Sequence, residues 1–230
     1  MDAAVAGSPG YAFSASDAAL MFLLSGGDKY CDLAVRMVEK EVAEAEAAIA
    51  TGARPAIAGD SYLEVGPRIA DLAMTLHACR TTIDATQQRR WSSYAEQAVW
   101  NVWNHPRAQW GGQAHAWTGW SVDNPGNNYY YSFIEATMYW ALVSGSASWM
   151  DDLRTRRLPP LKAYYAGLPG GGSREGTGYG AAQMRLFGLY RLWKDSTGED
   201  LAAASTHARD SIPYWVHATV PTLDRFAPIG

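Results

Sequence analysis

The stretch from Asp28 to Thr51 reads DKYCDLAVRMVEKEVAEAEAAIAT, and it is the clearest indication of the fold. Its apolar residues recur at spacings of three to five with charged residues between them, which predicts one amphipathic helix. The apolar stripe consists of Tyr30, Leu33, Met37, Val42, Ala45 and Ile49. Gly52 ends the pattern, because glycine is favoured just past the end of a helix.

The same periodicity continues along most of the chain. It predicts further helices at about 61–83, 86–103, 128–143, 148–165, 176–195 and 199–217. Pro159 and Pro160 are expected to break or kink the helix that contains them, and Pro213 to interrupt the last helix. No convincing alternation of period two indicates a strand. The sequence therefore predicts an all-α protein.

The predicted connections alternate between long and very short. The long ones are 52–60, 104–127 and 167–175, and the short ones lie near Asp84 and Gly145. In antiparallel helical hairpins, such alternation places every long loop at the same end. We therefore expect an incomplete (α/α) toroid of antiparallel hairpins, forming a single domain over residues 1–230.

Bulk composition excludes several classes of protein. The chain has 230 residues, a formal net charge of −4 and 48% hydrophobic residues. That hydrophobic fraction suffices for a packed core, which argues against a disordered protein. The acidic balance argues against nucleic-acid binding. The apolar run at 18–24 is too short to span a bilayer, so no membrane partner is expected.

The sequence indicates less about the role of the cysteines, the cellular compartment and any cofactor. Cys31 and Cys79 suggest neither a disulfide framework nor a zinc site, and each is interpreted as a small buried hydrophobic residue. No motif for a metal or cofactor is present, so none is expected. The first residues lack the basic region of a signal peptide. The protein is therefore expected to be cytoplasmic, or secreted or periplasmic if a signal peptide has been removed.

Tryptophan and tyrosine are in excess, with 10 Trp and 13 Tyr against 5 Phe. Three of the tryptophans, Trp110, Trp117 and Trp120, lie on the long loop at 104–127. Their rings are suited to stacking on the apolar faces of sugars, while polar groups bind the sugar edges. The alternative is that they simply plug the end of the helical ring. His115 on the same loop is a candidate helper base.

Two helix starts carry further polar residues. Asn127 and Asn128 open the predicted helix at 128–143, and one of them is expected to be its N-cap. The other amide is a candidate to bind a carboxylate. Arg174, Glu175 and Tyr179 open the helix at 176–195. Arg174 is a candidate anion ligand. Glu175 and Tyr179 are also candidate site residues; the alternatives are that Glu175 only stabilises the helix dipole and that Tyr179 is a core residue.

These residues resemble the heparinase II/III-like and alginate-lyase-like polysaccharide lyases. The similar elements are NNYYYSF from Asn127 and GGGSREGTGY from Gly170 to Tyr179, the latter like the family's DGxxxEGxxY segment. The TGEDL sequence from Thr197 resembles the end of the family's following helix. These elements span roughly a third of the chain and match only the toroid part of the family.

The resemblance implies β-elimination on a uronic-acid polysaccharide, an acidic polymer or oligosaccharide being the partner. Asn127 or Asn128 would neutralise the substrate carboxylate, and Tyr179 would be the base or acid. Arg174, Glu175, Tyr129 and the three loop tryptophans would bind substrate. Relatives often have histidine where this chain has Tyr129. They also continue into a β-sandwich, which this chain is expected to lack.

Two other functions remain open. A glycoside hydrolase on a similar toroid would use paired carboxylates such as Asp123 and Glu175. A non-catalytic carbohydrate-binding helical module would use the aromatic residues alone. The sequence indicates neither the polysaccharide, nor endo or exo action, nor the oligomeric state.

Overall fold

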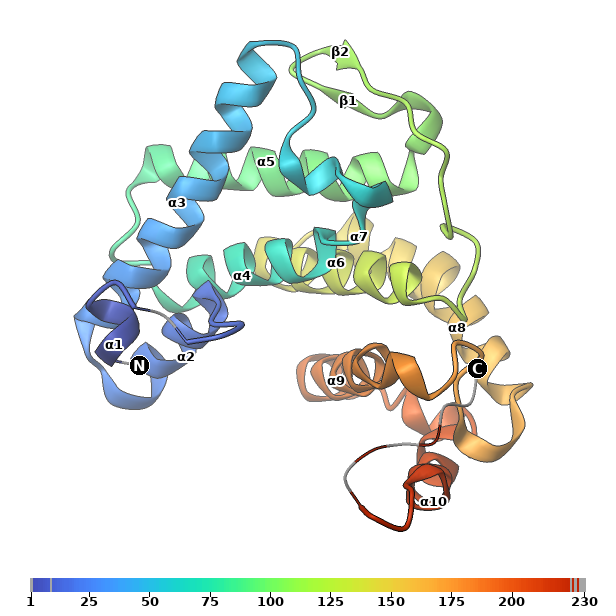
Figure 1. The fold of residues 1–230 in the computed structure, drawn as a ribbon. Helices are drawn as coiled ribbons and strands as arrows, with labels where there is room; N and C mark the ends of the chain where they lie inside the picture. Colours follow the sequence, from blue (N-terminus) through green and yellow to red (C-terminus); the bar gives the residue numbers. More distant parts are fainter. Residues whose placement is uncertain (1, 9, 224, 226, 228–230) are drawn as a thin grey trace. The chain divides into compact units, whose positions relative to one another are not determined.

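The computed structural model describes residues 2–8, 10–223, 225 and 227, and it is mostly helical. This confirms the all-α prediction. The helices are α1 (Asp2–Val5), α2 (Ala15–Ser25), α3 (Asp28–Ala50), α4 (Val65–Ala78), α5 (Ala85–Trp103), α6 (Asn128–Ser144), α7 (Ala147–Asp152), α8 (Leu158–Ala166), α9 (Gly180–Thr197) and α10 (His207–Ala218). Figure 1 shows their order along the chain. Among the described residues, no helix is both long and apolar enough to cross a bilayer.

The chain forms two compact units. Unit 1 comprises Met1–Trp120 and Glu135–Ser146, and unit 2 comprises Ser121–Ile134 and Ala147–Gly230. Helix α6 contributes its first turns to unit 2 and the remainder to unit 1. Two compact units can belong to one domain, so the expected single domain stays a prediction.

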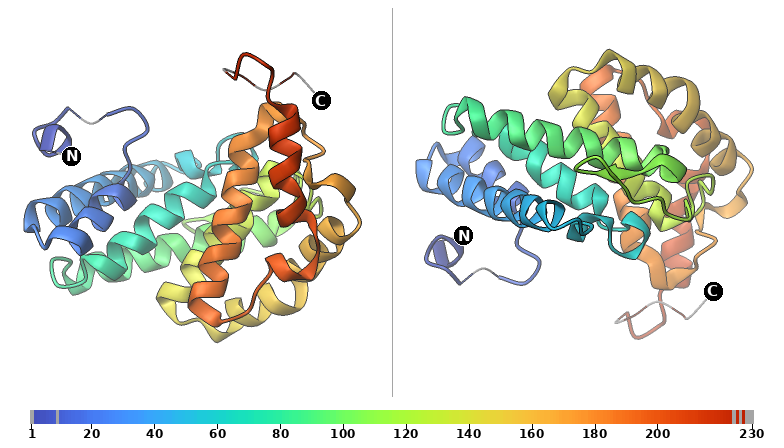
Figure 2. Two further views of the ribbon diagram at one scale, coloured as in Figure 1. Left: turned by 90° about the horizontal axis from the view of Figure 1, so that it is seen from below. Right: turned by 90° about the horizontal axis from the view of Figure 1, so that it is seen from above.

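Unit 1 is built on α2, α3, α4 and α5. Helix α2 packs on both α3 and α4, and α5 packs on α3 and α4 (Figure 2). Their buried faces form a core that includes Val42, Ile69, Leu72 and Trp91. The predicted stripe of α3 is only partly buried, because Leu33, Met37 and Ile49 lie at its edge. Helix α3 packs against α2, α4 and α5, so its buried face is wider than one stripe.

Helix α2 was absent from the predicted helices, although its start carries a recognisable signal. Ser14 Oγ accepts a hydrogen bond from the Asp17 N–H, and the Asp17 carboxylate accepts one from the Ser14 N–H. This reciprocal arrangement is a capping box. The apolar run at 18–24, considered above only as a membrane span, is therefore the body of a short helix.

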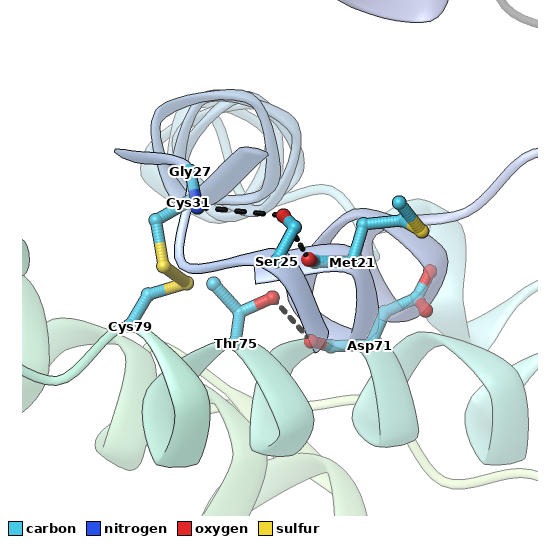
Figure 3. Close-up of a disulfide and its surroundings, with 7 residues drawn as sticks. All are labelled: Met21, Ser25, Gly27, Cys31, Asp71, Thr75 and Cys79. Atoms are coloured by element: carbon cyan, nitrogen blue, oxygen red, sulfur yellow. Dashed lines mark hydrogen bonds between the residues drawn. A yellow bond between two sulfur atoms is a disulfide. The ribbon is translucent and has the colours of Figure 1, made fainter. Parts of the chain in front are cut away.

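The two cysteines are buried, as expected, but the expectation that they form no disulfide is wrong. Cys31 on α3 and Cys79 at the end of α4 form a disulfide with their Cα atoms 5.4 Å apart (Figure 3). Both residues are at most 1% exposed. The cysteines are 48 residues apart in sequence. Spacing of that length carries no information on pairing, which depends on how α3 and α4 pack.

Two predicted breaks behave differently from each other. Before Pro159 and Pro160, the chain forms a π-helical turn at Leu153–Arg157, because each proline lacks the N–H that an α-helix needs there. The predicted interruption at Pro213 is wrong, since α10 runs through it. Pro213 and Arg209 both lie on the exposed side of α10, where the proline deprives the Arg209 carbonyl of its helical partner.

In unit 2, α9 and α10 lie side by side (Figure 2), joined by a hydrogen bond of 2.9 Å from Trp215 Nε1 to Gln183 Oε1. Helix α10 also packs on the turn at Pro169–Gly171. A Cβ on Gly171 would lie 2.1 Å from the Asp210 backbone, and Gly171 has a φ of +72°. Only glycine fits this turn, which holds the segment before α9 against α10.

Candidate functional site

The N-terminus of α6 organises the polar residues of unit 2. Asn127 precedes the helix, and its Oδ1 accepts a hydrogen bond of 3.1 Å from the Tyr129 N–H. Such a bond satisfies one of the amides that a helix start leaves without an intrahelical partner. Asn127 is therefore the capping residue of the predicted pair, and Asn128 is the first residue of the helix.

Glu175 lies at this helix start although it is 48 residues further along the chain. Its Oε1 accepts a hydrogen bond of 3.1 Å from Asn127 Nδ2. The Asn128 backbone N–H also donates to the carboxylate. The positive end of a helix favours an anionic group at this position. The structure thus brings together three predicted residues, and places a protein carboxyl where a substrate carboxylate was expected.

The Glu175 carboxyl is suited to hold a proton. Burial raises the pKa of Glu175 above its usual value, and the Asn128 N–H opposes that rise. Within the described part of the chain, its buried Oε2 has no hydrogen-bond partner. A carboxyl with a raised pKa and one unused oxygen has the properties required of a general acid or base.

A buried cluster of aromatic polar groups also lies within unit 2. The hydroxyls of Tyr131 and Tyr165 share a hydrogen bond. The Tyr165 ring packs on His207, with ring centroids 4.2 Å apart. Burial raises the pKa of both tyrosines above the usual value, so both stay protonated near neutrality. The cluster lies between α6, the end of α8 and the start of α10.

His207 is neutral in this environment. Burial lowers its pKa, although the Gly172 carbonyl, 2.8 Å from Nε2, opposes that effect. Since a carbonyl oxygen only accepts, Nε2 carries the proton and Nδ1 keeps a lone pair. Considering the described residues alone, Nδ1 is buried without a hydrogen-bond partner. The site thus holds a neutral imidazole with an unused acceptor.

The other predicted residues of unit 2 lie nearer the surface. Tyr179 is 48% exposed and directly precedes α9, so it is not a core residue. Arg174 is exposed. Burial raises the pKa of Tyr164, and the positive charge of Arg174 opposes that rise. The half-buried Tyr129 ring meets Phe133 edge-on at 6.5 Å between centroids.

In unit 1, the predicted loop residues differ widely in exposure. Trp110 is 2% exposed, Trp117 is half-buried and Trp120 is 58% exposed. The buried Trp110 agrees with a plugging role better than with an open stacking face. His115 is half-buried, and its Nε2 has no hydrogen-bond partner among the described residues.

The loop is ordered by a short hairpin that was not among the predicted elements. Strand β1 (Gln109–Trp110) pairs antiparallel with β2 (Gln113–Ala114) through Gly111 and Gly112, both at positive φ. Asn101, fully buried on α5, donates to the Gln109 carbonyl at 2.7 Å and accepts from its N–H at 2.9 Å. The paired glycines were the available signal for a tight hairpin turn.

Three buried polar residues of unit 2 were missed as site residues: Tyr131, Tyr165 and His207. Tyr131 lay within the quoted NNYYYSF sequence, so a signal was present. His207 had none, because a single histidine on a helix is usually a core residue. Among the described residues, no group of three or more His, Cys, Asp or Glu side chains is arranged to hold a metal ion.

Comparisons with known proteins do not place this chain in a family. No protein-family model, curated protein or solved structure matches it.

Proposed function

We propose that this protein is a polysaccharide lyase that cleaves a uronic-acid-containing polymer by β-elimination. The observation that carries the proposal is the half-buried Glu175 carboxyl, held at the start of α6 by Asn127 and Asn128. The positive end of a helix attracts an anion, and a carboxyl of raised pKa can hold a proton to donate. Together they are suited to bind the carboxylate of a substrate. The resemblance of the surrounding sequence to polysaccharide lyases supports the same function.

The hydrogen bonds at the start of α6 favour Asn128 over Asn127 as the residue that neutralises the substrate carboxylate. One of the two N–H groups of the Asn127 amide is bound to Glu175, which leaves at most one for a ligand. The Asn128 side chain is half-buried, and its amide takes no part in either bond to Glu175. We assign neutralisation of the substrate carboxylate to the Asn128 amide and to Glu175 in its protonated form. A second carboxylate beside Glu175 would raise its pKa further.

Elimination then needs a base and an acid. The base takes the C5 proton, the electron pair of that bond forms the C4–C5 double bond, and the C4–O bond breaks. The departing oxygen takes a proton from the acid. Tyr179 is exposed at the start of α9 and is assigned as the base or the acid. Its phenol needs a nearby cation or a polarised substrate proton to act near neutrality.

The proposed architecture is an incomplete (α/α) toroid. Support comes from helical pairs inside each unit, α4 with α5 in unit 1 and α9 with α10 in unit 2. The disulfide supports a secreted or periplasmic protein, because buried disulfides persist mainly in oxidising compartments. His115 as a helper base stays a prediction.

The test is a panel of alginate, heparin, chondroitin sulfate, hyaluronan and polygalacturonate, followed by absorbance of the unsaturated product. We expect one polymer to be cleaved. Tyr179→Phe and Asn128→Ala are each expected to lower kcat/KM by about 100-fold or more, the typical contribution of one proton-transfer group or oxyanion donor. Controls are Tyr11→Phe at a fully exposed tyrosine and Asn124→Ala at an exposed asparagine. Full activity in Tyr179→Phe would refute its assigned role.

A glycoside hydrolase is the second candidate, favoured by the raised pKa of Glu175. In that reaction Glu175 would be the general acid and Asp123 the second carboxylate. New reducing ends without a double bond, lost in both Glu175→Gln and Asp123→Asn, would replace the lyase assignment. Binding of a polymer with neither product would indicate a non-catalytic carbohydrate-binding module.

A further inference from the structure

Glu175 lies on a segment that has little regular structure of its own to position it. This segment, residues 170–176, connects the end of a short 3₁₀ turn to the start of the next and is otherwise irregular. Gly170, Gly171 and Gly176 have φ angles of +81°, +72° and +73°. Because glycine has more backbone freedom than any other residue, such a segment does not hold one conformation by itself. Contacts with other elements must therefore fix the position of the Glu175 carboxyl.

Two buried side chains bind carbonyl oxygens of the segment. Gln183 on α9 donates from Nε2 to the Gly171 carbonyl at 2.9 Å. His207 on α10 donates from Nε2 to the Gly172 carbonyl at 2.8 Å. Both side chains are 2% exposed. Losing either bond would leave a buried donor without its partner, which is costly.

Both donors are held in a fixed orientation. Gln183 Oε1 accepts from Trp215 Nε1 at 2.9 Å, which directs the Gln183 Nε2 group to the Gly171 carbonyl. The His207 ring packs on the Tyr165 ring, with centroids 4.2 Å apart. The segment is therefore bound from both α9 and α10 by side chains that are themselves fixed.

The path from these bonds to the Glu175 carboxyl is short. Ser173 directly follows Gly172, and its Oγ accepts a hydrogen bond of 3.1 Å from the Glu175 N–H. The Glu175 side chain then accepts from Asn127 at the start of α6. The carbonyl that His207 binds and the Glu175 backbone are thus joined by a compact turn, so a shift of one displaces the other.

His207 is not placed to touch a substrate, since its side chain is 2% exposed. The same holds for Gln183. Any effect of these two residues on chemistry at Glu175 passes through the backbone of the segment.

We propose that His207 and Gln183 are positioning residues, which hold segment 170–176 against α9 and α10 and thereby fix the Glu175 carboxyl at the start of α6. The inference rests on the proposed function in one respect, that Glu175 takes part in the reaction. Loss of either donor frees the segment to move toward water and lets the carboxyl become hydrated. The raised pKa of Glu175 then falls towards its usual value, because burial is what raises it.

The first measurement uses the unmodified chain. Nitrogen NMR of the histidine rings distinguishes the two tautomers of a neutral imidazole. The His207 proton is expected on Nε2 at a pH of about 7.5, since a carbonyl oxygen only accepts. A proton on Nδ1 instead would leave Nε2 with nothing to donate to Gly172, and the proposal would be overturned.

The second measurement follows the Glu175 carboxyl by carbon NMR during a pH titration, with Glu175→Gln to assign its signal. His207→Phe keeps a ring against Tyr165 but has no donor, so the Glu175 pKa is expected to fall towards its usual value. His207→Gln keeps a donor and is expected to keep the Glu175 pKa raised. The control, His217→Phe, is exposed on the same helix and is expected to change nothing.

Gln183→Met removes the other donor with little change in volume and leaves His207 in place, so it serves if His207→Phe does not fold. The same fall in the Glu175 pKa is expected. Gln113→Met, exposed on β2, is its control. The proposal is overturned if the Glu175 pKa stays raised in the folded variants that lack a donor, or if it falls as far in His207→Gln as in His207→Phe.

The activity readout connects this role to the reaction. With a polymer that is cleaved, His207→Phe is expected to lower kcat/KM by up to about 100-fold, as a small displacement of a catalytic group can do. The limb of the pH profile that reports Glu175 is expected to move to lower pH and to return in His207→Gln. A profile that loses height without moving would indicate a structural role alone and would overturn the proposal.

The two NMR measurements need no substrate, so they separate this proposal from the lyase assignment. Their failure would remove the positioning role and leave cleavage of the polymer untouched. Absence of an unsaturated product from every polymer, with both NMR results as expected, would instead refute the lyase assignment.

Discussion

The role that the sequence suggests for Glu175 differs from the contacts that it makes in the structure. Its sequence position allows a simple role in stabilising the dipole of the helix that follows it. In the structure it instead binds Asn127 and the Asn128 N–H, at the start of a different helix. One N–H of the Asn127 amide is therefore already bound within the protein.

His207 makes a specific prediction about acid stability. Its folded-state pKa lies below the usual value of 6.5 because burial disfavours the charged imidazole. The folded state therefore binds this proton more weakly than the unfolded chain. The associated stability is present above about pH 6.5 and is lost as the pH falls below that value. Urea midpoints at about pH 7.5 and pH 5 measure this loss.

His207→Gln is expected to reduce that pH dependence, since glutamine does not titrate but keeps a donor for the Gly172 carbonyl. The exposed His77→Gln variant serves as the control and is expected to behave as the unmodified chain does. An unchanged pH dependence in His207→Gln would assign the acid lability to other groups.

Among the helices, α3 and α5 were predicted closely because their apolar periodicity and end signals are local. Helix α5 begins at a capping box, in which Asp84 accepts from the N–H groups of Thr86 and Gln87. Helix α4 is shorter than predicted: Asp60, Ser61 and Tyr62 before it have left-handed φ angles, and Cys79 directly follows its last residue. Those limits arise from packing rather than from periodicity.

The disulfide joins α3 to α4, and we expect it to stabilise the folded chain by a measurable amount. Closing a loop of about 48 residues reduces the entropy of the unfolded chain, which corresponds to about 4 kcal/mol by the loop-closure relation. Replacing both cysteines, Cys31→Ala with Cys79→Ala, is expected to lower the free energy of unfolding by about 3–4 kcal/mol. Urea denaturation measures the change.

The matched control for that prediction is chemical reduction. A thiol reductant strong enough to open a buried disulfide should destabilise the unmodified chain by a similar amount and leave the double variant unaffected. If reductant does not move the urea midpoint of the unmodified chain even after prolonged partial unfolding, the cysteines are not bonded in the protein.

The division into two units carries a prediction for the molecule as a whole. The disulfide lies entirely within unit 1, whereas α9 and α10 lie in unit 2. Its removal should increase amide hydrogen exchange in α2, α3 and α4 more than in α9 and α10, because local opening reports the stability of each cooperative unit. Equal loss of protection in both units would show that the chain opens as one unit.

Local information in the sequence determined the all-α class, the extents of α3, α5 and α6, and the asparagine cap at the start of α6. These features depend on residues within a few positions of each other, whose spacing on a helix is fixed. The pairing of Cys31 with Cys79, the contact of Glu175 with Asn127 and the burial of His207 came from the folded chain alone. Each depends on how distant segments pack, and helical periodicity does not specify which faces meet.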